Sequence, residues 1–146
     1  MEILVTVIVL SIGLLGLAGL QLAGLKYNHS AYLRSQATVL TSDILDRMRA
    51  NRTSGLTGTY DIAIGTPSPT PVATCNGSAT DNCTPAQMAA LDISQWKQDL
   101  GSILPAGDGS IVRTVTGNQT LLTITIQWDD TRGVGAATQF PSETLL

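Results

Sequence analysis

A run of 23 residues without a charged side chain, Ile3 to Leu25, constrains the fold of this chain more than any other feature. A helix rises about 1.5 Å per residue, and a bilayer core is about 30 Å thick. The run is therefore long enough to span a membrane as a helix. A glutamate, Glu2, stands at its head with no basic residue nearby to pair with it.

Residues 26–52 continue the helix, since they contain neither proline nor glycine. Their apolar residues recur at steps of four and three and form one stripe: Leu33, Ala37, Leu40, Ile44 and Met48. We expect one helix of about 50 residues at the usual rise. Its first half is apolar all round, and its second half has one apolar face. This change predicts a boundary between residues 1–25, for membrane or helix packing, and a globular domain over 26–146.

Small residues punctuate the apolar run at Gly13, Gly16, Gly19 and Ala23. A glycine costs about 1 kcal/mol in a water-exposed helix, whereas small residues let membrane helices approach closely. These four positions are candidates for helix packing. Glycine is also simply common in membrane helices, and that alternative stays open.

A loop and a second helix follow. Gly55 and Gly58 are expected to end the first helix, and residues 53–83 are rich in Thr, Ser, Pro, Gly and Ala. Thr84, Pro85 and Gln87 then form a capping box that predicts a helix start. Its apolar stripe is expected at Ala89, Ile93, Trp96, Leu100 and Ile103, with Gly101 and Pro105 bounding its end.

The period changes to two after this helix. Residues 110–116 are a predicted strand, and in "LLTITIQW" Leu122, Ile124, Ile126 and Trp128 alternate with polar residues. That alternation is typical of an antiparallel strand with one buried face. A third, shorter strand is expected at 136–141. The fold class is α+β, with predicted core residues Leu33, Leu40, Ile44, Met48, Trp96 and Trp128.

Two cysteines, Cys75 and Cys83, lie close together in the polar loop. Such a pair favours a disulfide in an oxidising compartment, and two free thiols are the alternative. Their spacing matches no zinc or redox signature.

The remaining chemistry is sparse. The net charge of −3 and the pI near 4.8 argue against a nucleic-acid-binding surface. The single histidine, His29, and the acids Asp108, Asp129 and Asp130 are weak candidates for function, since such residues are usually solvated. No G-x-S-x-G or phosphate-binding glycine loop occurs. We therefore predict no enzyme activity, cofactor or metal.

Taken together, these stretches resemble a known family. A glutamate heading a charge-free run, a long helix and a small antiparallel sheet resemble type IV pilins. The segments "SIGLLGLAGLQ", "AYLRSQATVLTSDILDRMRANR", "CTPAQMAALDISQWKQDL" and "ITIQWDD" resemble the PilV type of minor pilin, the type IV pilus modification protein. The resemblance covers essentially the whole chain and implies a pilin-like fold.

The resemblance also implies roles and partners. Glu2 would pair with an N-terminal amine and set axial registry during assembly, whereas the alternative is an acid in the headgroup region favoured by the helix dipole. The implied partners are other major and minor pilins, the inner-membrane pilus assembly machinery, and membrane lipid before assembly. The implied location is the inner membrane with a periplasmic domain, then the pilus, with adhesion as a possible role of the displayed domain.

Two departures and two alternatives remain. The family's basic leader and its methylated phenylalanine do not precede Met1, so we expect the precursor to extend upstream. Such a segment would also reconcile the topology, because the basic residues that follow the run would otherwise place the domain in the cytoplasm. The alternatives are a type II secretion pseudopilin and a single-pass membrane-anchored binding or enzymatic domain without a filament role.

Overall fold

The long N-terminal helix is present as α1, Glu2–Ala50. A computed structural model describes residues 2–72, 75, 82–131 and 133–146. Part of the polar loop expected at 53–83, and Met1, lie outside these residues. The chain divides into two compact units, Met1–Leu33 and Arg34–Leu146, and each is described by itself. The first unit is entirely helical over its described residues.

A short second helix, α2, Arg52–Thr57, follows α1 directly. Gly58 caps it in the left-handed region at φ 81°, a conformation that glycine adopts without steric cost. Gly55 does not end a helix, contrary to the prediction, and lies inside α2. It is buried there because the side chain of Leu146 packs against it, so that a Cβ atom would have to displace the end of that side chain.

The second predicted helix is α3, Pro85–Ile103, which begins at the predicted Thr84 cap. Its last turn differs from the prediction. Ile103 is 41% exposed, whereas Leu104 is 1% exposed. Both residues suit a stripe that continues from Leu100, but Leu104 leaves the helix in an extended conformation and turns into the core. Gly101 lies within the helix instead of bounding it.

Three antiparallel strands complete the second unit in the order β1-β2-β3. They are β1, Asp108–Thr116, β2, Gln119–Trp128, and β3, Thr138–Leu145. β1 starts two residues earlier than predicted, and β3 lies later and is longer than the predicted 136–141. The register with β2 sets both limits, because Asp108 pairs with Gln127 and Thr138 pairs with Trp128.

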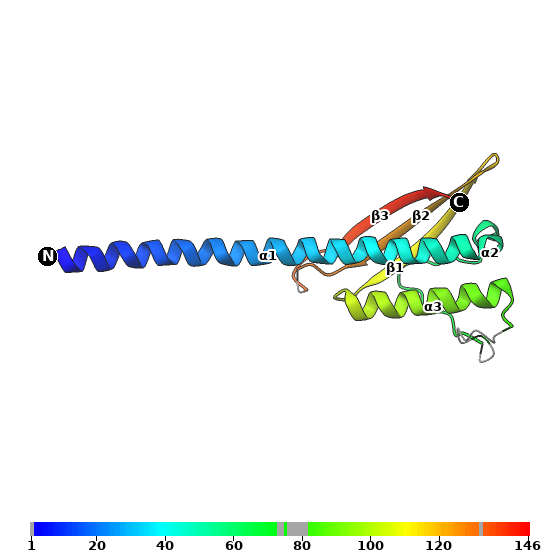
Figure 1. Cartoon of the computed structure of the whole chain (residues 1–146), viewed down its shortest axis with the longest axis horizontal. Helices are drawn as coiled ribbons and strands as arrows, with labels where there is room; N and C mark the ends of the chain where they lie inside the picture. Colours follow the sequence, from blue (N-terminus) through cyan, green and yellow to red (C-terminus); the bar gives the residue numbers. More distant parts are fainter. Residues whose placement is uncertain (1, 73–74, 76–81, 132) are drawn as a thin grey trace. The chain divides into compact units, whose positions relative to one another are not determined.

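The core of the second unit lies between its helices and the sheet. α3 runs alongside the second half of α1 (Figure 1), and the indole Nε1 of Trp96 donates to the Leu40 carbonyl at 3.1 Å. Gly109 lets β1 approach α3, since a Cβ there would lie 2.5 Å from the Trp96 ring. The fully or almost fully buried side chains include Ala37, Leu40, Ile44, Met48, Tyr60, Trp96, Leu100, Ile111, Leu122, Ile124, Ile126 and Trp128.

The architecture is therefore α+β, with a long apolar N-terminal helix, a further helix and a small antiparallel sheet. This is the predicted fold class. Leu33, the first residue of the predicted stripe, is 2% exposed and belongs to the first unit.

Candidate functional site

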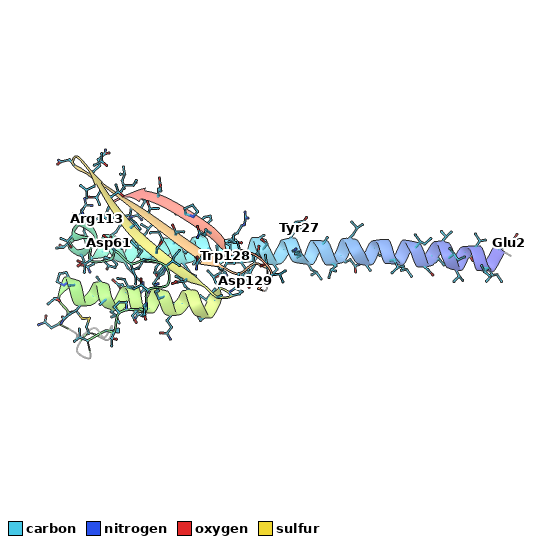
Figure 2. All side chains as sticks on the ribbon, turned by 180° about the vertical axis from the view of Figure 1, so that it is seen from behind. Glu2, Tyr27, Asp61, Arg113, Trp128 and Asp129 are labelled. Atoms are coloured by element: carbon cyan, nitrogen blue, oxygen red, sulfur yellow. A yellow bond between two sulfur atoms is a disulfide. The ribbon has the colours of Figure 1, made fainter. Side chains whose placement is uncertain are left out.

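The first unit presents an apolar surface on every side of α1. Its helix is long and apolar enough to cross a membrane, and none of its most apolar stretch is buried within the chain. Figure 2 shows the side chains of this apolar stretch directed outward around the helix axis, with Glu2 at the end of the helix. Ile3 is 80% exposed and Leu15 is 74% exposed. An isolated chain in water would not keep such a surface uncovered.

Glu2 lies in the first turn of α1, where the helix dipole favours an acid. Its carboxylate has no ion-pair partner among the residues that the structure describes. Gly13, Gly16 and Gly19 have open space where a Cβ would be. The roles predicted for Glu2, for these glycines and for Ala23 need a second chain, so they stay predictions.

A polar network ties α1 to α3 inside the second unit. The guanidinium of Arg47 contacts Asp43 at 2.9 Å, Gln95 at 2.6 Å and Asp92 at 3.6 Å. The buried carboxylate of Asp92 also accepts the hydroxyl hydrogen of Tyr60 at 2.5 Å. Burial of Tyr60, with the hydrogen bond and the charge of Asp92, raises the pKa of its phenol well above 10.0. Tyr60 therefore stays protonated and holds the loop after α2 against α3.

The sequence indicates only one contact of this network. Asp43 and Arg47 stand four residues apart, the spacing at which opposite charges on an exposed helix face can pair, whereas Arg47 is half-buried and has three partners. A signal was present at Asp92, which is an acid directly beside Ile93 in the apolar stripe of α3. An acid in that position needs a buried partner.

A second ion pair fixes the start of the sheet. Lys97 Nζ donates to Asp108 Oδ1 at 2.6 Å and to the Thr66 carbonyl at 3.0 Å. The N–H groups of Gly65 and Gly109 donate to the same carboxylate at 2.6 and 2.7 Å. Partial burial alone would raise the pKa of Asp108, but the hydrogen bonds from Lys97 and the two backbone groups outweigh it and lower that pKa.

These contacts give Asp108 a structural role. Among the described residues, no three His, Cys, Asp or Glu side chains gather in a way that would hold a metal ion. Asp129 accepts hydrogen bonds from the backbone and the hydroxyl of Thr131 at 2.8 and 2.9 Å. His29 is exposed on α1.

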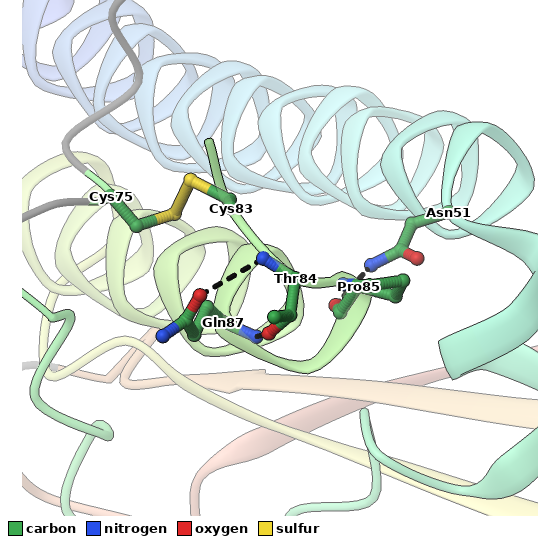
Figure 3. Close-up of a disulfide and its surroundings, with 6 residues drawn as sticks. All are labelled: Asn51, Cys75, Cys83, Thr84, Pro85 and Gln87. Carbon is green, nitrogen blue, oxygen red and sulfur yellow. Dashed lines mark hydrogen bonds between the residues drawn. A yellow bond between two sulfur atoms is a disulfide. The ribbon is translucent and has the colours of Figure 1, made fainter. Parts of the chain in front are cut away.

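The two cysteines form a disulfide immediately before α3 (Figure 3), with their Cα atoms 5.4 Å apart. The bridge leads into the capping box, where Thr84 N–H donates to Gln87 at 2.9 Å and Gln87 N–H donates to Thr84 at 3.3 Å. The Asn51 amide donates to the Pro85 carbonyl at 2.7 Å. The start of α3 is thus bound to the end of α1.

The outer edge of β3 is poorly suited to pairing with another strand. Ile62 and Ile111 exchange backbone hydrogen bonds of 3.0 and 2.9 Å, so the polar backbone groups of Ile111 point away from β2. Successive residues of an antiparallel strand turn their backbone N–H and C=O groups to opposite sides. The backbone groups of Ser110 therefore face Thr125, and those of Thr125 face β1. Pro141 pairs with Thr125 on the other side, so its backbone faces the outer edge, where it has no N–H to donate. Any added strand would lose a hydrogen bond at that point.

Comparison with known proteins identifies a related family. A family model described as Tt1218-like, type IV pilin Tt1218, matches residues 19–94, which are 76 of the 146 residues. The match runs from the apolar part of α1 through α2 into α3. The search of curated proteins and the search of solved structures gave no significant match.

Proposed function

Because the chain belongs to the Tt1218-like family of type IV pilins, we propose that it is a minor pilin that takes part in the assembly of a type IV pilus. The type IV pilin family is structural, which supports a role of this chain in assembly. The resemblance of its "RMRANR" and "WDD" segments supports the PilV type within that family.

The uncovered apolar surface of the first unit carries this proposal. An exposed leucine or isoleucine side chain forgoes about 1.5–3 kcal/mol relative to full burial, and this unit exposes more than ten large apolar side chains. Lipid covers that surface while the subunit is held in the membrane, and the helices of other major and minor pilins cover it in the filament. The pilus assembly machinery transfers the subunit from one setting to the other.

Glu2 is proposed to set the register of this transfer. A carboxylate inside the hydrocarbon region costs about 2.5–3.5 kcal/mol or more, so it favours a position where a cation can pair with it. We propose an N-terminal amine, from a neighbouring pilin or from the same chain, as that cation. At about 4 Å and an effective dielectric near 20, the attraction is roughly 4 kcal/mol before desolvation.

We propose that residues 1–25 are the membrane and filament-core segment, and that residues 26–146 are a periplasmic domain that the pilus then displays at the cell surface. Display on the pilus would expose the surface of this domain outside the cell, as a role in adhesion requires. A fragment of residues 26–146 should be a soluble monomer with a cooperative melt under oxidising conditions. Persistent aggregation of that fragment would contradict the boundary at Lys26.

An exchange of the apolar segment tests the function directly. Residues 3–25 are replaced by an unrelated apolar helix of equal length, and the chain is quantified in sheared filaments and in the membrane fraction. A pilin should insert into the membrane but be lost from the filaments, because the surface of the helix is itself the interface. If the chain with the unrelated helix still performs its function in the cell, that result would favour the membrane-anchored domain without a filament role. Recovery of the native chain in a secretion complex instead of pili would favour the pseudopilin.

The Glu2→Gln variant tests registry in the same assay. It keeps the size of the side chain and should leave membrane insertion intact while depleting the chain from the filaments. The matched control is Glu143→Gln, which removes an exposed carboxylate from β3. Equal incorporation of the two variants would show that the Glu2 charge has no part in assembly.

A further inference from the structure

Three uncharged side chains with hydrogen-bonding groups lie within the apolar run, at Thr6, Ser11 and Gln21. The hydroxyls of Thr6 and Ser11 bond to carbonyls of their own helix, at 2.8 Å to Ile3 and 2.7 Å to Val7. These two groups are therefore satisfied in any apolar surroundings. Gln21 differs, because its exposed amide has no hydrogen-bond partner among the described residues.

The position of Gln21 makes its amide hard to satisfy with water. It lies four residues before Leu25, the end of the apolar run, which is about 6 Å along the helix. Helical side chains tilt toward the N-terminus of their helix. The Gln21 side chain therefore extends deeper into the apolar segment and away from the polar residues that begin at Lys26.

Lipid chains cannot replace that water. A carboxamide offers two N–H donors and a carbonyl acceptor, and hydrocarbon provides no partner for any of them. A polar group left unpaired in such surroundings costs free energy, so the amide favours a neighbour that can bond to it. The helix of another subunit can present hydrogen-bonding groups at this depth.

We propose that the Gln21 amide hydrogen-bonds across to the apolar helix of a second pilin subunit and so selects the axial level at which the two helices meet. This inference rests on the proposed pilin function and deepens it by assigning a position within the assembly surface. Gly24, one turn beyond Gln21 on the same side, has nothing within 4 Å of where its Cβ would lie. The missing side chain lets the partner helix approach to hydrogen-bonding distance.

The test uses the full chain in pilus-forming cells and measures its ratio in sheared filaments to the membrane fraction. Gln21→Met keeps the length and flexibility of the side chain but removes the amide. Hydrogen bonds between membrane helices are worth enough to predict a roughly 3- to 10-fold fall in this ratio. Ser11→Ala is the matched control and should stay within about twofold of the native chain, because its hydroxyl bonds within its own helix.

A third variant asks whether the axial level matters. Gln21→Met combined with Leu17→Gln moves the amide one turn toward Glu2 on the same side of the helix. A contact at a fixed level predicts that this double variant stays depleted. Full recovery would show that any amide in this region suffices, and would overturn the assigned position.

The remaining outcomes separate this inference from the function on which it rests. Native incorporation of Gln21→Met would overturn the inference and leave the minor-pilin proposal intact. Absence of the native chain from filaments would overturn the proposed function and the inference with it. Equal depletion by Gln21→Met and Ser11→Ala would point to general sensitivity of the helix, and would also contradict a specific role for the amide.

Discussion

The two halves of α1 share one helical geometry but differ in what covers their apolar side chains. In the first unit, Leu15 is 74% exposed, whereas Leu40 in the second unit is 5% exposed. The second half has one apolar stripe and covers it with α3 and the sheet of its own chain. The first half is apolar on every side and has no such cover among the described residues.

The difference shows that apolar content alone does not define a core. A single small domain can cover one apolar stripe of a helix, but a helix that is apolar all round needs cover on every side. Changes in the second half should therefore alter the folding stability of the domain. Changes in the first half should leave that stability unchanged, and any effect that they have should fall on assembly.

The largest effect on stability is expected at the two tryptophans of the second unit. Both side chains are fully buried, so replacing either with alanine should lower the free energy of unfolding by about 3–5 kcal/mol. Denaturant unfolding of the full chain in detergent, followed by circular dichroism, measures this change. Losses below about 1 kcal/mol for both variants would contradict their assignment to the core.

Phenylalanine substitutions sharpen the same test. Trp96 donates a hydrogen bond to Leu40, whereas the buried Nε1 of Trp128 has no partner among the described residues. Trp96→Phe should therefore cost about 0.5–1.5 kcal/mol more than Trp128→Phe, because it removes a hydrogen bond, whereas Trp128→Phe removes only an unpaired donor.

The next largest effect is expected from the disulfide. Replacing Cys75 and Cys83 with serine opens a loop whose ends are eight positions apart, and this should lower the unfolding free energy by about 2–3 kcal/mol. Reduction of the native protein should give a similar loss, and it provides a control for the effect of the serines. No change in the unfolding midpoint on reduction would show that the bridge adds no stability to the second unit.

Most of the secondary structure could be predicted from local patterns. The capping box at Thr84 and the alternation from Leu122 to Trp128 depend on neighbouring residues, and the structure has both. The polar network could not be predicted, since Arg47 meets Asp92 and Gln95 from a distant part of the chain. β3 was misplaced because only its register with β2 fixes its limits. The exposed apolar surface of the first unit could be predicted from the charge-free run, but the contacts that this surface makes depend on a second chain.

A smaller effect is expected at Asp108, and it depends on pH. The folded state lowers the pKa of this group below its ordinary value of 3.8, so the stabilisation is present above pH 3.8 and is lost as the pH falls through the lowered pKa. Asp108→Asn should cost about 1–2 kcal/mol at pH 7 and progressively less below pH 3.8. The control is Asp46→Asn, which removes an exposed pair with Arg49. A loss that does not change with pH would argue against the ion pair with Lys97.

The smallest effect on stability is expected in the first half of α1, from a substitution chemically identical to one in the second half. Leu15→Ala removes a side chain that has no core around it, and alanine is itself a good helix former. The unfolding free energy of the second unit should change by less than about 0.5 kcal/mol. Leu40→Ala should lower it by about 2–5 kcal/mol, because it opens a cavity between packed elements. Since Trp96 and Trp128 are the two tryptophans of the chain and both lie in the second unit, their fluorescence reports unfolding of that unit in both variants. Equal losses from Leu15→Ala and Leu40→Ala would mean that the first half contributes to the folded domain, and the division between assembly surface and core would have to be abandoned.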